Sequence, residues 1–156
     1  MSEEEFAHLR QTFVVAHQAR EHGNHPFAAL LINTNNEVVL TAENSVVTDA
    51  DTTAHAEINL IRAATPNFTP EQLSNFTIIS SAEPCAMCAA ALVWANIRNV
   101  VFGLSMDKIY AMFGDPGDAP VLAIASREIF KHAPWPVQVR GPMLEEEASL
   151  PHAGFW

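Results

Sequence analysis

The sequence predicts an α/β fold in three layers, α/β/α, in which a mixed sheet of about five strands carries helices on both faces. Two observations predict this fold. Helical spacing of apolar residues alternates along the chain with short runs of β-branched and aromatic residues. Residues 76–102 are arranged as strand, helix and strand, which makes a unit with two parallel strands. Residues 1–156 are expected to form a single domain, because no linker or low-complexity stretch divides them.

The amino-terminal part is expected to be a helix followed by a β-hairpin. Ser2 to Glu5 forms a capping-box pattern, and apolar residues then recur at helical spacing from Phe6 to Ala16. This helix is expected to end near Gly23, since glycine is common just after a helix end. Residues 27–33 and 38–42 are predicted strands, joined by a polar turn.

A helix is predicted next, over residues 54–64, and Pro66 and Pro70 are expected to break the chain after it. Residues 76–80 form a predicted buried strand, which leads directly into a strongly helical segment that contains both cysteines. A further strand is predicted over 100–102. The two helix starts then lie at one end of the sheet, where α/β folds place their functional sites.

The cysteines and one upstream triplet supply the ligands for a metal site. The chain has two cysteines, Cys85 and Cys88, in the motif Pro-Cys-Ala-Met-Cys, and the triplet His55-Ala56-Glu57 precedes them. Three residues apart, the cysteines share a face of the first helical turn, and the helix start favours their thiolate forms. A site of four cysteines is impossible within one chain. Three ligands and an open position are typical of catalytic zinc.

The triplet divides its work between two side chains. His55 and Glu57 are two residues apart and cannot share a helical face well, so they are expected to have different roles. A neutral His55 and two thiolates leave a zinc site formally neutral. Water bound to such a zinc has its pKa lowered to roughly 7, so hydroxide is available at neutral pH. Glu57, free of the metal, can carry the proton of this water to a leaving group.

Three other interpretations of the cysteine motif stay open. The cysteines can be a redox pair, although the motif lacks the pattern of such pairs. The metal can be a closed structural zinc with a fourth protein ligand. The chain can also be an inactive relative that binds metal, against which the intact Glu57 argues. Loop histidines are most often solvated, and a second metal site is not expected at His22 and His25. The candidate fourth ligands are a carboxylate, His22, His25, His132 and His152.

Further residues fall in an order and spacing that are typical of a known family. They are Pro26-Phe27-Ala28-Ala29, Asn44, Thr53-Ala54-His55-Ala56-Glu57 and Glu83-Pro84-Cys85-Ala86-Met87-Cys88. Over residues 5 to 105 the chain resembles the zinc-dependent cytidine deaminase superfamily, in the branch of guanine deaminases and tRNA adenosine deaminases. The resemblance implies the cytidine deaminase-like fold and a homodimer. It also implies one zinc per chain on His55, Cys85 and Cys88, with Glu57 as the catalytic proton shuttle.

The resemblance implies four substrate-binding residues in the matched region. An asparagine at the position of Asn44 hydrogen-bonds the substrate in this family, although asparagine also commonly turns the chain. Phe27 and Ala28 resemble the floor of the pocket, and alanine in place of the family's frequent glycine narrows it. Trp94 stands where guanine deaminase-like members have an aromatic residue, and a core tryptophan of a buried helix is the alternative.

The carboxyl-terminal third departs from the family pattern. Asp115 resembles an acidic loop residue that contacts the base in guanine deaminase-like enzymes, with Asp118 as the second candidate and an ordinary turn as the alternative. Phe155 and Trp156 are large apolar residues at a chain end, so they are expected to dock. The resemblance implies that residues 143–156 form a lid over the substrate or a dimer contact, and simple anchoring to the core is the alternative.

Charge and hydropathy restrict the partners. Eight Lys and Arg face 18 Asp and Glu, and the cations are spread along the chain, so a nucleic-acid partner is not expected. No apolar run approaches the length of a membrane span and no signal peptide is visible, so neither membrane insertion nor export is expected. Thiolate ligands suit a reducing compartment, which favours the cytoplasm.

The sequence therefore predicts a zinc-dependent hydrolytic deaminase of a free, aminated purine-like base or nucleoside, with guanine-type substrates favoured. A tRNA adenosine deaminase and a cytosine or cytidine deaminase are the alternatives within the class. The alternative from another class is an inactive zinc-binding interaction module.

Overall fold

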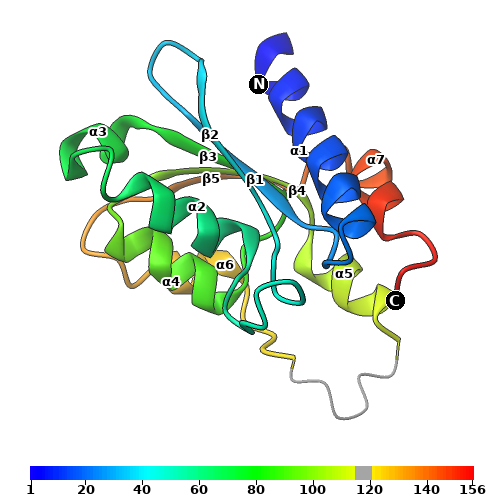
Figure 1. Ribbon diagram of the computed structural model, residues 1–156. Coiled ribbons are helices and arrows are strands. Elements are labelled where there is room, and N and C mark those ends of the chain that lie inside the picture. Colours follow the sequence, from blue (N-terminus) through cyan, green and yellow to red (C-terminus); the bar gives the residue numbers. More distant parts are fainter. Residues whose placement is uncertain (115–120) are drawn as a thin grey trace.

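The computed structural model describes residues 1–114 and 121–156, and its centre is a mixed five-stranded sheet in the order β2-β1-β3-β4-β5 (Figure 1). The first three neighbours in this order pair antiparallel, and β3, β4 and β5 run parallel. The strands are β1 (Ala28–Ile32), β2 (Val38–Glu43), β3 (Thr77–Ala82), β4 (Asn99–Leu104) and β5 (Gln138–Arg140). This arrangement confirms the predicted α/β class and the mixed sheet.

Helices cover both faces of the sheet, which confirms the three layers (Figure 1). α1 and α7 pack on one face, and α2, α4 and α6 on the other. The helices are α1 (Glu3–Glu21), α2 (Ala56–Ala64), α3 (Pro70–Asn75), α4 (Ala86–Trp94), α5 (Met106–Met112), α6 (Ser126–Phe130) and α7 (Glu145–Ser149), followed by the 3₁₀ turn η1 (Leu150–His152). None of the helices in the described ranges combines the length and apolar content needed to cross a bilayer.

Alternation along the central strands divides the core between the two faces. One apolar cluster joins Leu30, Ile79 and Val101 of the sheet to Leu9 and Phe13 of α1. The other joins Leu31, Ile78 and Val100 to Leu60 of α2 and Leu92 of α4. Because both faces of β1, β3 and β4 are buried, these strands are largely apolar, and Ser80 and Ser81 of β3 are buried polar residues.

Local signals in the sequence place the first elements where they were expected. Ser2 Oγ accepts from the Glu5 backbone N–H at 3.2 Å, and Glu5 Oε2 accepts from the Ser2 N–H at 2.9 Å, which completes the capping box. α1 ends at Glu21, and Gly23 follows with φ +94°. The β1–β2 turn contains Asn36 at φ +62°, a conformation that asparagine tolerates.

Two expectations need correction or extension. Pro70 does not break the chain but occupies the first turn of α3, where proline is tolerated because its missing N–H has no partner in the helix. A capping box between Thr69 and Gln72 starts this helix. The β3–α4–β4 unit is parallel as predicted, and β5 adds a further parallel strand that the sequence pattern did not show.

Candidate active site

The elements converge on one cavity of about 450 Å³ at the end of the sheet where β2, β3 and β4 finish and β1 begins. Its wall combines titratable groups with apolar and aromatic side chains. The lining residues are His25, Phe27, Asn44, Val46, Thr52, His55, Glu57, Glu83, Cys85, Met106, Ile109, Tyr110, Phe113, Val121 and Trp156. A mostly apolar cavity with a few convergent polar groups is the usual form of a small-molecule site.

Three predicted ligands meet beside this cavity. His55 is the N-cap of α2, Cys85 is the N-cap of α4, and Cys88 lies on the first turn of α4. His55 Nδ1 is 3.6 Å from Cys85 Sγ and 3.5 Å from Cys88 Sγ. Zinc bonds of about 2.3 Å to sulfur and 2.0–2.1 Å to nitrogen place tetrahedral ligand atoms about 3.5 Å apart, so the donor set fits zinc.

No other group of three His, Cys, Asp or Glu side chains could hold a metal within residues 1–114 and 121–156. His22, one of the alternative ligands, instead pairs with the Glu43 carboxylate at 2.8 Å. Both sulfurs are free thiols and approach the same imidazole nitrogen. This shared approach is the geometry of a metal site with one open position rather than of a redox pair.

Neighbouring side chains stabilise the thiolate form of Cys85, which is the form that binds a cation. The Cys88 thiol, together with His55, lowers the pKa of Cys85 to about 4 despite its partial burial. The Cys85 thiolate in turn raises the pKa of Cys88 and of His55. Cys85 therefore favours the deprotonated form that a metal ligand must have.

Glu57 lies on the first turn of α2, near the ligands but separate from them. It is 6 % exposed, and burial raises the pKa of its carboxyl group. The Ser80 hydroxyl, from inside β3, donates a hydrogen bond to Glu57 Oε1 and opposes that rise. A buried carboxyl that faces the cavity and has a raised pKa suits proton transfer near neutral pH. Ser80 was not predicted, and the available signal was a hydroxyl within a buried strand.

Asn44 and Phe27 line the cavity as expected, and Asn44 also turns the chain. Asn44 is 1 % exposed, and its Oδ1 accepts from the Val46 backbone N–H at 3.0 Å. Ala28 is buried at the start of β1, behind the lining residues, where its N–H donates to Ser81 Oγ at 3.0 Å. Two of the predicted pocket residues therefore reach the cavity, and Ala28 supports it from behind.

Trp94 does not reach the cavity. It ends α4 and is 91 % exposed, so the alternative of a core tryptophan is wrong. Trp94 and Cys85 lie at opposite ends of α4, because Cys85 is the N-cap of this helix and Trp94 is its last residue. Within one chain, Trp94 is a surface residue.

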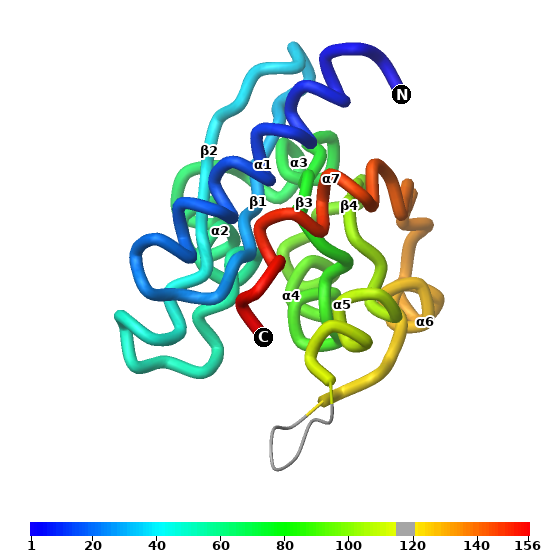
Figure 2. The backbone as a smooth tube through the Cα atoms, turned by 90° about the vertical axis from the view of Figure 1, so that its right-hand side faces the viewer, coloured from blue at the N-terminus to red at the C-terminus, as the bar shows by residue number. Residues whose placement is uncertain are grey.

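The carboxyl-terminal segment, whose path beside α1 is seen in Figure 2, brings Trp156 into the lining of the cavity. The Trp156 ring lies 4.2 Å from the Phe113 ring, 5.5 Å from the His25 ring and 6.1 Å from the Phe27 ring. Phe155 packs edge-on against Trp156 at 4.7 Å but does not line the cavity. Asp115 and Asp118 lie outside the described residues.

Several lining residues were not predicted to face the cavity. His25 is half-buried against Trp156 rather than a solvated loop histidine, which corrects the expectation. Glu83 accepts hydrogen bonds from the Met106 N–H at 2.9 Å and from the Ser126 N–H at 3.0 Å. Its carboxylate thus attaches the starts of α5 and α6 to the end of β3. The other unpredicted residues are Val46, Thr52, Met106, Ile109, Tyr110, Phe113 and Val121, of which Met106, Ile109 and Tyr110 lie on α5.

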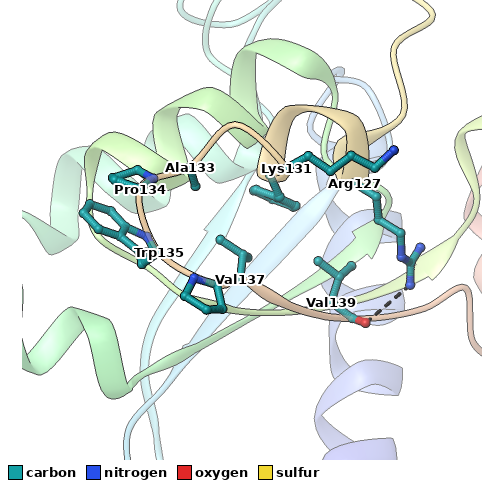
Figure 3. Close-up of a pocket in the computed structure, with 9 residues that line it drawn as sticks. Arg127, Lys131, Ala133, Pro134, Trp135, Val137 and Val139 are labelled. Carbon is teal, nitrogen blue, oxygen red and sulfur yellow. Dashed lines mark hydrogen bonds between the residues drawn. The ribbon is translucent and has the colours of Figure 1, made fainter.

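A second hollow of about 680 Å³ lies between α6 and β5, away from the ligand triad (Figure 3). Its two cations already have partners. Arg127 donates to the Gly141 carbonyl at 2.9 Å, and Lys131 pairs with the Glu128 carboxylate at 2.8 Å. Its lining contains no carboxylate, thiol or imidazole. The chemistry of the chain is therefore concentrated in the first cavity.

Comparison with known proteins agrees with this site. Residues 2–104 match the model of the cytidine and deoxycytidylate deaminase zinc-binding region. A probable cytosine deaminase of Schizosaccharomyces pombe is 40 % identical over 156 residues, which cover all of this chain and 94 % of that protein. The guanine deaminase of Bacillus subtilis is 35 % identical over 91 residues, 58 % of each chain.

Solved structures share the fold. A guanine deaminase from Nitrosomonas europaea superposes with a TM-score of 0.76 at 22 % identity, over 97 % of this chain and 84 % of that one. At this identity the likeness concerns the fold alone. The matched zinc-binding region contains all three ligands and Glu57, and the relative from S. pombe is similar from end to end. The chain is therefore a member of the zinc-dependent cytidine and deoxycytidylate deaminase family.

Proposed function

We propose that this deaminase acts on a free nucleobase, with cytosine as the first candidate and guanine as the second. The observation that carries the proposal is the cavity in which the ligand triad and Glu57 face aromatic side chains from the carboxyl-terminal third. A flat, uncharged base has the shape and the polarity that such a wall accepts.

The similarity of the carboxyl-terminal third favours cytosine. Met106, Ile109, Tyr110, Phe113 and Trp156 come from this part of the chain and form much of the apolar wall. The probable cytosine deaminase of S. pombe is similar over the whole chain, including this wall. The guanine deaminase of B. subtilis and the tRNA-specific adenosine deaminases match over 58–67 % of the chain rather than over its whole length. Guanine-type substrates, which the sequence pattern favoured, are therefore proposed as the second candidate after cytosine.

The reaction is a hydrolysis at the ring carbon that carries the amino group. Zinc, held by His55, Cys85 and Cys88, supplies an activated water when bound. Glu57 would take one proton from the water and give it to the ring nitrogen, and would then take the second proton from the same oxygen and give it to the departing amine. The water oxygen forms a bond to the ring carbon, the bond from that carbon to the amino nitrogen breaks, and ammonia leaves.

Asn44 and Trp156 orient the base in this scheme. The Asn44 amide nitrogen is available for a base oxygen or ring nitrogen, because Oδ1 is occupied by the backbone of Val46. The Trp156 indole covers the face of the base. Orientation of a bound substrate against the attacking group contributes a large part of the rate of such reactions.

A tRNA substrate is disfavoured. The chain carries 8 basic and 18 acidic residues, and several of the basic side chains are in ion pairs on the surface. The contact between Trp156 and Phe113 also narrows the mouth that a flipped nucleotide would enter. A free base avoids both obstacles. A cytoplasmic location is part of the proposal, because thiolate ligands are preserved in a reducing compartment.

The protein is also proposed to work as a homodimer through α4. Met87, Ala90, Ala91 and Trp94 recur at helical spacing on one face, and none of them is buried within the single chain. The large exposed indole of Trp94 at the end of this stripe is the kind of side chain that anchors a protein interface. A second copy of the chain is the proposed partner.

The experiment is an ammonia-release assay with zinc-loaded protein. Cytosine, guanine, adenine and the corresponding nucleosides are compared, and the highest kcat/KM is expected for cytosine. Glu57→Gln should keep the zinc but lower kcat at least about 10²-fold, because an amide carries no proton. Glu43→Gln is the matched control, since Glu43 makes only an exposed pair with His22, and its kcat should stay unchanged.

Full activity of Glu57→Gln would contradict the proposed proton shuttle. Ammonia release from a nucleoside but not from a free base would contradict the free-base proposal. Stoichiometric zinc without ammonia release from any of the compounds would favour the non-catalytic binding module.

A further inference from the structure

The last residues of the chain are clamped by the end of α1. Arg20, in the last turn of α1, donates through Nη1 to the carbonyl of Pro151 at 3.0 Å and to the carbonyl of Ala153 at 2.6 Å. Its guanidinium also lies 5.4 Å from the centre of the Phe155 ring. One side chain therefore binds the turn that precedes Trp156 at three points.

His152 holds Trp156 directly. The imidazole is 3 % exposed, and its Nδ1 accepts a hydrogen bond from Trp156 Nε1 at 3.0 Å. The two rings are nearly parallel, at 17°, and Phe27 packs against the other part of the imidazole with centroids 5.1 Å apart. Burial, with the nearby Arg20 charge, lowers the pKa of His152 to about 4, so the ring is neutral at physiological pH and Nδ1 is free to accept.

A histidine at position 152 lowers the stability of the fold if its role is packing alone. Its Nε2 is buried and has no hydrogen-bond partner in the part of the chain that the structure describes. An unpaired buried polar group destabilises a fold, and an aliphatic side chain at this position would avoid the cost. The histidine makes a hydrogen bond to the Trp156 indole that an aliphatic side chain could not make. His152 is absent from the cavity wall, so it acts on a bound base through the two lining residues that it contacts, Trp156 by a hydrogen bond and Phe27 by packing.

We propose that Arg20 and His152 are positioning residues that hold the Trp156 indole over the cavity and so set how tightly a base is bound. This proposal rests on the proposed nucleobase deaminase function. Arg20 fixes the backbone of the final turn, and His152 fixes the rotation of the indole about its side-chain bonds. A fixed indole loses little further freedom when a base stacks on it, which favours binding.

Two readouts test the proposal, and one of them does not need activity. The first is the rate at which a carboxypeptidase removes Trp156, followed by mass spectrometry, because such cleavage measures how often the tail opens. The second is the separate measurement of KM and kcat for cytosine. The variants are Arg20→Leu, His152→Leu and His152→Asn, with Arg10→Leu as the matched control. Arg10 lies on the same helix, and its guanidinium pairs with Glu147 of α7 rather than with the turn that precedes Trp156.

Arg20→Leu and His152→Leu should speed removal of Trp156 about tenfold and raise KM about fivefold, as expected for the loss of one or two hydrogen bonds, with a smaller change in kcat. His152→Asn keeps an acceptor for the indole N–H and should restore both values to within about twofold of wild type. Arg10→Leu should match wild type. Retention of the wild-type melting transition shows that the variants are folded.

Removal of Trp156 at the wild-type rate in both leucine variants would overturn the clamp. Faster removal with an unchanged KM would overturn the link between the clamp and the base. If the wild-type protein released no ammonia from any base, the proposed function would fail, while the carboxypeptidase rates would still decide whether the clamp exists.

Discussion

Replacement of Trp156 by alanine separates the contribution of this side chain to catalysis from its contribution to stability. Trp156 is 41 % exposed, so more than half of a large aromatic side chain is covered, roughly 120 Å². At about 25 cal/mol per Å², and after a discount for the compactness of the unfolded chain, this burial stabilises the fold by about 2–3 kcal/mol. The lost hydrogen bond to His152 adds about 1 kcal/mol.

The expected consequence of losing about 3–4 kcal/mol is a fall in Tm of roughly 6–16 °C, given about 2–4 °C per kcal/mol for a domain of this size. The same substitution removes the side chain that covers the base, so kcat/KM for the preferred base should fall at least about tenfold, which corresponds to about 1.4 kcal/mol of lost transition-state binding. Calorimetry and ammonia release, both on zinc-loaded protein, measure the two quantities.

Trp135→Ala is the matched control. Trp135 is also a partly buried tryptophan, it packs under the Arg98 guanidinium at 4.5 Å, and it lines the second hollow rather than the cavity. It should lower Tm by a comparable amount and leave kcat/KM within about twofold of wild type. If Trp156→Ala lowered Tm but left kcat/KM as high as that of Trp135→Ala, the indole would be an anchor only, and its assignment as a substrate contact would be refuted.

Three further substitutions test the rest of the site. Cys85→Ala or Cys88→Ala should reduce the zinc content from about one per chain to near zero, as measured by atomic absorption, and normal zinc in either variant would contradict the ligand set. Ser80→Ala removes the hydrogen bond that lowers the pKa of Glu57, so this pKa rises and the acidic limb of kcat/KM should move to higher pH. An unmoved pH profile would show that Ser80 does not act on Glu57. Trp94→Arg should convert a homodimer into a monomer in light scattering with little change in Tm, and a dimer that persists would move the interface away from α4.

The sequence alone determined the parts of the molecule whose signals are local. A capping box, a hairpin turn and the βαβ pattern each depend on residues a few positions apart, and each element formed where it was expected. The three zinc ligands were also predicted from local signals. The spacing of Cys85 and Cys88 places both at the start of α4, and His55 lies at the start of a helix at the same end of the sheet. The separate role of Glu57 was predicted because it lies two residues from His55 and cannot share a helical face with it.

Only the tertiary structure decided which side chains complete the cavity. Trp156 and Phe113 are far apart in the sequence, and their contact depends on the Arg20 clamp and on Glu83, which ties α5 to the end of β3. No periodicity records such contacts, because they are made between elements whose relative placement follows from packing of the whole core. Trp94 is a second example. The helix that contains it was predicted correctly, but the exposure of its side chain depends on which parts of this helix the neighbouring elements cover.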